Sequence, residues 1–130
     1  MLLSGKICVV TGAASERGLG MATAKLFAEH GAKLVILDLD AAASKRAADS
    51  IGPGHIGLAC DVTSKPACEA AVAAAIARFG RIDVLVNNAG ITQPIKTLDI
   101  TPADYEAVTD VSLRGTLYMS QAALPAMVKQ

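Results

Sequence analysis

Four short apolar runs recur along the chain, and a segment with helical character follows each of them. The apolar runs span residues 6–11, 33–38, 56–60 and 82–86. The helical segments span residues 21–30, 41–50, 66–79 and 102–127. Nearly continuous apolar strands that alternate with helices are typical of a parallel sheet covered on both faces. Because such crossovers are right-handed, residues 1–130 are predicted to form one α/β domain with a doubly wound, Rossmann-type, mostly parallel sheet.

Charge and apolar-run length exclude several classes of partner. The 12 basic and 12 acidic residues cancel, which argues against a nucleic-acid surface or a charged membrane surface. The apolar runs are far shorter than the ~20 residues that a bilayer requires, so we expect a cytoplasmic protein. Three cysteines, Cys8, Cys60 and Cys68, and two histidines have no metal-ligand spacing. No metal site is therefore expected.

A glycine-rich turn lies between the first apolar run and the first helical segment, in "TGAASERGLG" at residues 11–20. Gly12 allows a sharp turn, while Gly18 and Gly20 leave room for a pyrophosphate at the start of the helix. Unpaired amide groups and the helix dipole favour an anion there. The spacing differs from G-x-G-x-x-G, so a purely structural turn is the alternative.

Asp38 strengthens the dinucleotide interpretation. It ends the second apolar run, eighteen residues beyond Gly20. A dinucleotide fold places an acceptor for the adenosine ribose hydroxyls at this position. Together, the glycine turn and Asp38 favour NAD over a mononucleotide.

Four segments resemble the short-chain dehydrogenase/reductase family, in the family's order: "TGAASERGLG", Asp38, "CDV" at 60–62 and "NNAG" at 87–90. The resemblance implies hydride transfer between a nicotinamide cofactor and a small-molecule carbonyl or alcohol. It also implies that the cofactor contacts Gly12, Ser15, Arg17, Gly18, Leu19, Gly20, Asp38, Asp61, Val62, Asn88, Ala89 and Gly90. "NNAG" follows the fourth apolar run, and open α/β sheets bind ligands beyond the carboxyl ends of their strands.

The glycine turn departs from the family pattern. Five residues separate Gly12 from Gly18, where the family has three. Arg17 resembles the basic residue that phosphate-cofactor members place against the 2′-phosphate, whereas Asp38 would repel that phosphate. We expect Asp38 to be the nearer charge and NAD to be preferred, with NADP through Arg17 as the alternative.

The catalytic part of the family pattern is incomplete. Ser112 stands where the family has a proton-relay asparagine, and serine has a shorter reach. No Tyr-x-x-x-Lys is present, so the resemblance implies that this chain, a sheet truncated after the helix that follows strand four, is inactive alone. A non-catalytic dinucleotide-binding or interaction module is the alternative. We also expect an apolar sheet edge at residues 84–86, covered by a partner segment or a second copy.

Overall fold

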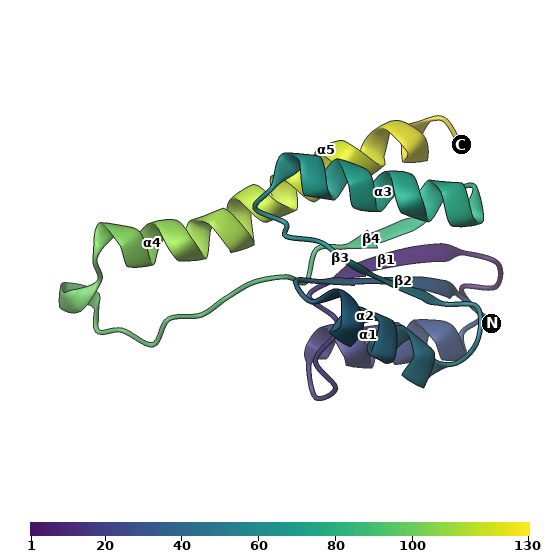
Figure 1. Cartoon of the computed structure of the whole chain (residues 1–130), viewed down its shortest axis with the longest axis horizontal. Helices are drawn as coiled ribbons and strands as arrows, with labels where there is room; N and C mark the ends of the chain where they lie inside the picture. The colour runs from purple at the N-terminus through teal and green to yellow at the C-terminus, as the bar shows by residue number, and fades with distance from the viewer.

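Four parallel strands form the centre of the computed structural model, which describes residues 1–130 (Figure 1). The strands are β1 (Ile7–Thr11), β2 (Lys33–Asp38), β3 (Ile56–Ala59) and β4 (Val84–Val86). Their order in the sheet is β3-β2-β1-β4, so the chain crosses from one edge of the sheet to the other between β3 and β4. This order confirms the predicted doubly wound α/β fold.

Helices cover both faces of the sheet. The α-helices are α1 (Leu19–Glu29), α2 (Ala41–Ile51), α3 (Lys65–Phe79), α4 (Pro102–Thr109) and α5 (Gly115–Val128). A short 3₁₀ helix, η1 (Thr97–Asp99), precedes α4, and a π-helical segment, η2 (Asp110–Arg114), joins α4 to α5. Figure 1 shows α1 and α2 on one side of the sheet and α3 and α5 on the other, with α4 projecting beyond it.

Alternating side chains of the central strands fill the two cores. Cys8 and Val10 of β1 and Leu34 and Ile36 of β2 pack on the face that α1 and α2 cover. Their chain neighbours, such as Val9, pack on the face of α3 and α5. Both faces of β1 and β2 are buried, so nearly all of their residues are apolar. This explains the unbroken apolar runs at residues 6–11 and 33–38.

Most helix ends lie within two residues of their predicted positions. Helix α1 starts two residues before the predicted Met21, and His30 is its C-terminal cap. Ser64 caps α3, since its hydroxyl accepts a hydrogen bond from the amide of Ala67 at 3.3 Å. Asp40 caps α2 by accepting from the amide of Ala43 at 2.6 Å.

The strands β3 and β4 are shorter than predicted. Strand β3 ends at Ala59 rather than at Cys60, and β4 begins at Val84 rather than at Ile82. The apolar residues of β4 are half-buried rather than exposed, because Leu85 packs against one core and Val84 and Val86 against the other. Only the hydrogen-bonding edge of β4 is open.

The predicted single helix over residues 102–127 is wrong in its middle. The π-helical segment η2 interrupts it, and regular α-helix resumes at Gly115. A π-helical turn inserts an extra residue and rotates the helix that follows. Gly115 packs so closely against Val62 that an added Cβ would lie 2.6 Å from the Val62 Cγ2 atom. A uniform helical period cannot predict this local adjustment.

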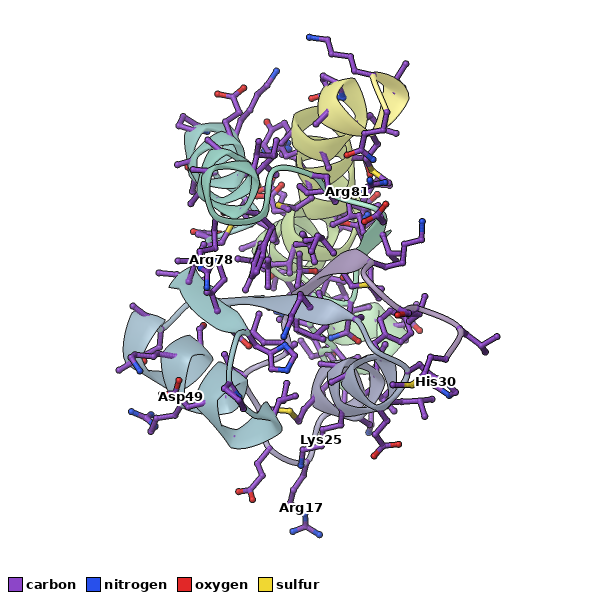
Figure 2. The ribbon with its side chains drawn as sticks, turned by 90° about the vertical axis from the view of Figure 1, so that its right-hand side faces the viewer. Arg17, Lys25, His30, Asp49, Arg78 and Arg81 are labelled. Atoms are coloured by element: carbon purple, nitrogen blue, oxygen red, sulfur yellow. The ribbon has the colours of Figure 1, made fainter.

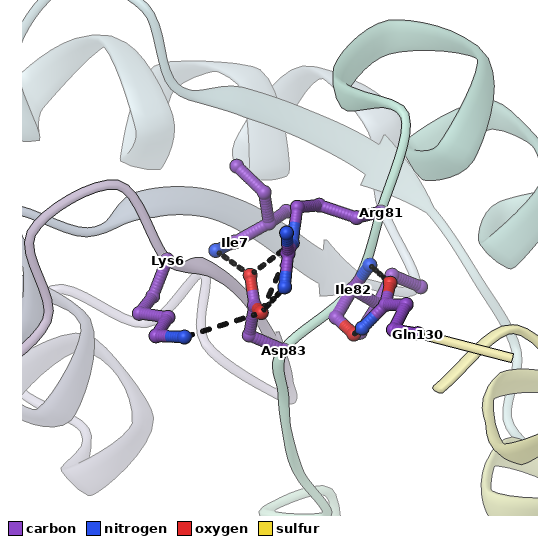
Figure 3. A network of polar contacts seen from close by, with 6 residues as sticks. All are labelled: Lys6, Ile7, Arg81, Ile82, Asp83 and Gln130. Carbon is purple, nitrogen blue, oxygen red and sulfur yellow. Dashed lines mark hydrogen bonds and ion pairs between the residues drawn. The ribbon is translucent and has the colours of Figure 1, made fainter. Parts of the chain in front are cut away.

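A buried carboxylate joins β1 to β4 at the amino ends of the strands (Figure 3). The side chain of Asp83 is 7% exposed and accepts a hydrogen bond from the amide of Ile7 at 2.8 Å. Arg81 and Lys6 form ion pairs with it at 2.5 Å and 3.7 Å. Burial alone would raise the pKa of Asp83, but these hydrogen bonds and charges outweigh it and lower the pKa below its usual value. The side-chain amide of Gln130 binds both backbone polar groups of Ile82 nearby.

Candidate functional site

A cavity of about 590 Å³ lies at the carboxyl ends of the four strands. It combines the turn after β1, the end of β2, the segment after β3, the segment after β4 and one residue of η2. The lining residues are Gly12, Gly18, Leu19, Asp38, Leu39, Cys60, Asp61, Val62, Thr63, Asn88, Ala89, Gly90, Ile91 and Val111. A ligand cavity at this end of an open α/β sheet is typical of the fold class.

Gly12 allows the segments after β1 and β4 to touch. Its φ angle is +63°, in the left-handed region that favours glycine. A Cβ at this position would lie 2.8 Å from the Cα atom of Ala89. The turn therefore depends on glycine both for its conformation and for the close approach of "NNAG".

Thr11 and Asn88 fix these two segments together. The Thr11 hydroxyl accepts hydrogen bonds from the amides of Asn88 and Ala89 at 3.1 Å and 2.9 Å. The Asn88 side-chain amide donates to the carbonyl groups of Thr11 and Gly12, each at 3.0 Å. The side chain of Asn88 thus holds the turn after β1 to the segment after β4.

The first turn of α1 is open to an anion. Gly18 is its N-cap and provides no side-chain hydrogen bond, and the turn contains no acidic residue. The first amides of a helix have no partner within the helix, and the helix dipole adds positive potential. Gly18 and Leu19 both line the cavity. The residues present therefore fit a phosphate group.

Asp38 brings a carboxylate into the cavity at the end of β2. Its Oδ2 atom accepts a hydrogen bond from the amide of Ala14 at 3.0 Å, and its Oδ1 atom accepts one from the amide of Leu39 at 2.8 Å. A carboxylate has about four lone-pair sites, so acceptor capacity remains on both oxygens. Asp38 can therefore accept from ribose hydroxyls without losing these contacts.

The segment after β3 forms the wall next to Asp38. Asp61 accepts hydrogen bonds from the amide and the hydroxyl of Thr63 at 2.9 Å and 2.7 Å. Buried Val62 presents an apolar surface backed by Gly115. Burial, together with Cys68 and Asp61, raises the pKa of Cys60 to about 12, so this thiol stays neutral near pH 7 and is a poor nucleophile.

Four of the predicted site residues lie outside the cavity lining, namely Ser15, Arg17, Gly20 and Ser112. Arg17 is exposed and points away from the molecule (Figure 2). Gly20 packs against the interior, since a Cβ there would lie 2.6 Å from the side-chain Nδ2 atom of Asn88. Ser112 lies beside Gly90, whose Cβ would be 3.4 Å from the Ser112 hydroxyl oxygen.

Sequence reasoning did not assign five of the lining residues, namely Leu39, Cys60, Thr63, Ile91 and Val111. Leu39, Cys60, Thr63 and Ile91 each adjoin a predicted site residue, so proximity in sequence could have indicated them. Val111, which lies in η2 and adjoins Ser112, could have been indicated in the same way. Thr11, which holds "NNAG" in place, was read only as the end of a strand.

Comparison with known proteins identifies the family of the chain that forms this cavity. The family model described as enoyl-(acyl carrier protein) reductase matches residues 12–130. The chain belongs to the short-chain dehydrogenase/reductase family. The matched residues include residues 12–20 of the glycine turn, Asp38, "CDV" and "NNAG", on which the resemblance is based.

Relatives of this short-chain dehydrogenase/reductase chain include several oxidoreductases. An uncharacterized short-chain type dehydrogenase/reductase from Sinorhizobium fredii is 49% identical and is matched over 98% of this chain and 52% of its own length. Galactitol 2-dehydrogenase from Agrobacterium fabrum is 40% identical, over 98% of this chain and 49% of its own. The present chain therefore spans about half the length of these curated relatives.

A solved structure also resembles this short-chain dehydrogenase/reductase chain closely. It is the crystal structure of 3-ketoacyl-(acyl-carrier-protein) reductase from Brucella melitensis complexed with NADH. The TM-score is 0.89 at 39% sequence identity, over 95% of this chain and 50% of that one. None of the helices in the present chain combines the length and apolarity needed to cross a bilayer.

Proposed function

We propose that this chain is the cofactor-binding half of an NAD-dependent oxidoreductase that interconverts a small-molecule carbonyl and alcohol. One observation supports this proposal: the N-terminus of α1, which has no side-chain cap, and the carboxylate of Asp38 lie in the same cavity. The α1 terminus would hold the pyrophosphate, Asp38 the adenosine ribose, and Val62 the adenine face. Asn88, Ala89 and Gly90 would line the path toward the nicotinamide, which supplies the hydride donor or acceptor when bound.

The charge at Asp38 supports NAD over NADP. Two like unit charges ~4 Å apart repel by about 4 kcal/mol at an effective dielectric constant of 20. A 2′-phosphate beside Asp38 would meet this repulsion. Arg17, the cation that could offset it, lies outside the cavity lining and points into solvent (Figure 2). We therefore propose that NAD is preferred, because Asp38 lies nearer than Arg17 to the position of a 2′-phosphate.

Calorimetric titration of the purified protein with NADH and with NADPH tests the proposal. We expect micromolar NADH binding and at least ~10-fold weaker NADPH binding, a difference of about 1.4 kcal/mol. The Arg17→Gln variant is the matched control and should leave both affinities unchanged. Equal or tighter NADPH binding would contradict the NAD preference, and a folded protein that binds neither cofactor would overturn the proposed function.

The roles proposed for the remaining predicted residues concern the turn and the reacting end. Ser15 would shape the turn, since its carbonyl accepts from the amide of Gly18 at 3.0 Å. Gly20 would act by packing against Asn88. Ser112 would support the reacting end of the cavity from beside Gly90. The three cysteines are free and buried, which supports the proposed cytoplasmic location because reducing compartments keep thiols unpaired.

A second copy of the chain is the partner that we propose for an exposed apolar surface of α4, η2 and α5. Tyr105, Leu113, Leu117 and Leu124 are all more than half exposed along α4, η2 and α5. Spacings of four and seven residues place the three leucines on one helical stripe, here called the leucine stripe. Self-association would remove this stripe from water.

A further inference from the structure

Few hydrogen bonds join residues 13–18 of the glycine turn to the rest of the molecule. Ala13 donates its amide to the carbonyl of Leu37 at a long 3.4 Å, and the turn closes on itself through Gly18 and Ser15. Ser15, Glu16 and Arg17 are exposed. Among residues 13–18, the only hydrogen bond with a side chain of another element is the one from Ala14 to Asp38.

The bond between Ala14 and Asp38 lies where it can control the anion site. Asp38 is anchored at the end of β2, where its carbonyl accepts from the amide of Cys60 at 2.7 Å and its Oδ1 atom accepts from Leu39. Ala14 directly precedes the exposed part of the turn, which leads into Gly18. An ionised acceptor makes a shorter and stronger hydrogen bond than a neutral one. Fixing Ala14 restricts the turn that carries the amides of α1.

We infer that Asp38 is a positioning residue for the glycine turn, in addition to its proposed contact with the ribose. This inference rests on the proposed function and deepens it. By holding Ala14, the carboxylate keeps the turn in its binding conformation before the nucleotide arrives. A site that is ordered in advance loses less conformational entropy on binding. Removing Asp38 should therefore weaken binding of the pyrophosphate even when no ribose hydroxyl is available.

The two possible roles of Asp38 predict different changes in the affinity for one probe, 2′,3′-dideoxy-ADP, when Asp38 is replaced by alanine. This nucleotide keeps the pyrophosphate but lacks both ribose hydroxyls that a carboxylate could accept from. If Asp38 acts only on the ribose, Asp38→Ala removes a negative charge near a diphosphate, so the probe should bind equally well or more tightly. If Asp38 also positions the turn, the same substitution should weaken binding.

Binding of ADP and 2′,3′-dideoxy-ADP should be measured by calorimetry for wild type, Asp38→Ala and Asp38→Asn. We expect Asp38→Ala to weaken dideoxy-ADP binding by ~5-fold, about 1 kcal/mol, as for one lost hydrogen bond. Asp38→Asn keeps one acceptor oxygen, which can serve Ala14 while the contact with Leu39 is lost, and binding should remain within ~2-fold of wild type. Glu16→Gln is the matched control: it removes a negative charge from the exposed part of the turn, outside the cavity lining, and it should not weaken the probe.

Hydrogen exchange at the Ala14 amide provides a readout that needs no nucleotide. We expect faster exchange in Asp38→Ala than in wild type, with protection retained in Asp38→Asn. Unchanged protection, or dideoxy-ADP binding to Asp38→Ala that equals or exceeds wild type, would overturn the inference. If wild type binds neither nucleotide, the proposed function fails, while exchange at Ala14 still decides whether Asp38 holds the turn.

Discussion

At the scale of single residues, His55 links protonation to folding at the sheet end opposite the cavity. Its Nδ1 atom accepts a hydrogen bond from the amide of Leu34 at 3.0 Å. Burial, and then the charge of Lys33, lower the pKa of His55 below its ordinary value. A lowered pKa means that the unfolded chain takes up the proton first. His55 therefore contributes stability above about pH 6.5, and this contribution is lost as the pH falls through the folded-state pKa.

Thermal unfolding at a series of pH values tests the role of His55. We expect the wild-type midpoint to fall between about pH 7.5 and about pH 5.5. His55→Gln should lose most of this dependence, because glutamine does not titrate and its side-chain oxygen can still accept from Leu34. His30→Gln, at the cap of α1, should keep the wild-type slope. An unchanged slope in His55→Gln would show that other groups control the dependence.

Individual site residues were predictable where the local backbone requires a particular residue type. Gly12 and Asp38, for which the sequence predicts cofactor contacts, both line the cavity, because a sharp turn needs glycine and a strand end presents its carboxylate. Gly20 occupies the predicted segment but packs against Asn88 rather than lining the cavity. The distinction depends on a contact between residues distant in sequence, which a local pattern does not contain.

At the scale of elements, Asp40 determines how α2 begins. Its carboxylate accepts from the amide of Ala43, and loss of such a cap costs about 1 kcal/mol. We expect Asp40→Ala to lower the free energy of unfolding by that amount in urea denaturation. Asp49→Ala is the control within α2: Asp49 pairs with Lys45 on the surface, and exposed pairs contribute less than ~1 kcal/mol. Equal losses in both variants would contradict the capping role.

Element boundaries were predictable where caps and breakers mark them. The predicted helix start at residue 102 is confirmed: Thr101 caps α4, and the capping box adds a reciprocal bond from the Thr101 backbone to Asp104. The segment η2 was not predictable from pattern, because its residues continue an ordinary helical sequence. Directly after η2, Gly115 of α5 packs against Val62 in the segment after β3, a contact between residues distant in sequence.

At the scale of the whole molecule, the leucine stripe predicts self-association. We expect the wild-type protein to form dimers or larger oligomers in light scattering after size-exclusion chromatography. The double variant Leu113→Ser/Leu117→Ser should shift the mass toward the monomer, since apolar burial is worth about 25 cal/mol per Å². Leu98→Ser is the control, because Leu98 is 98% exposed in η1, outside the stripe. A monomeric wild type would contradict the proposal.

The bonds between Thr11 and Asn88 have a consequence for synthesis on the ribosome. The two residues are 77 positions apart. At ~5–20 residues per second, translation needs roughly 4–15 s to pass from one to the other. Until then the emerging chain has β1 with its β4 side unpaired and "NNAG" not yet made. The cavity is therefore incomplete until "NNAG" has emerged, so we expect no stabilisation by nucleotide before then, and β1 keeps an open edge until β4 pairs with it.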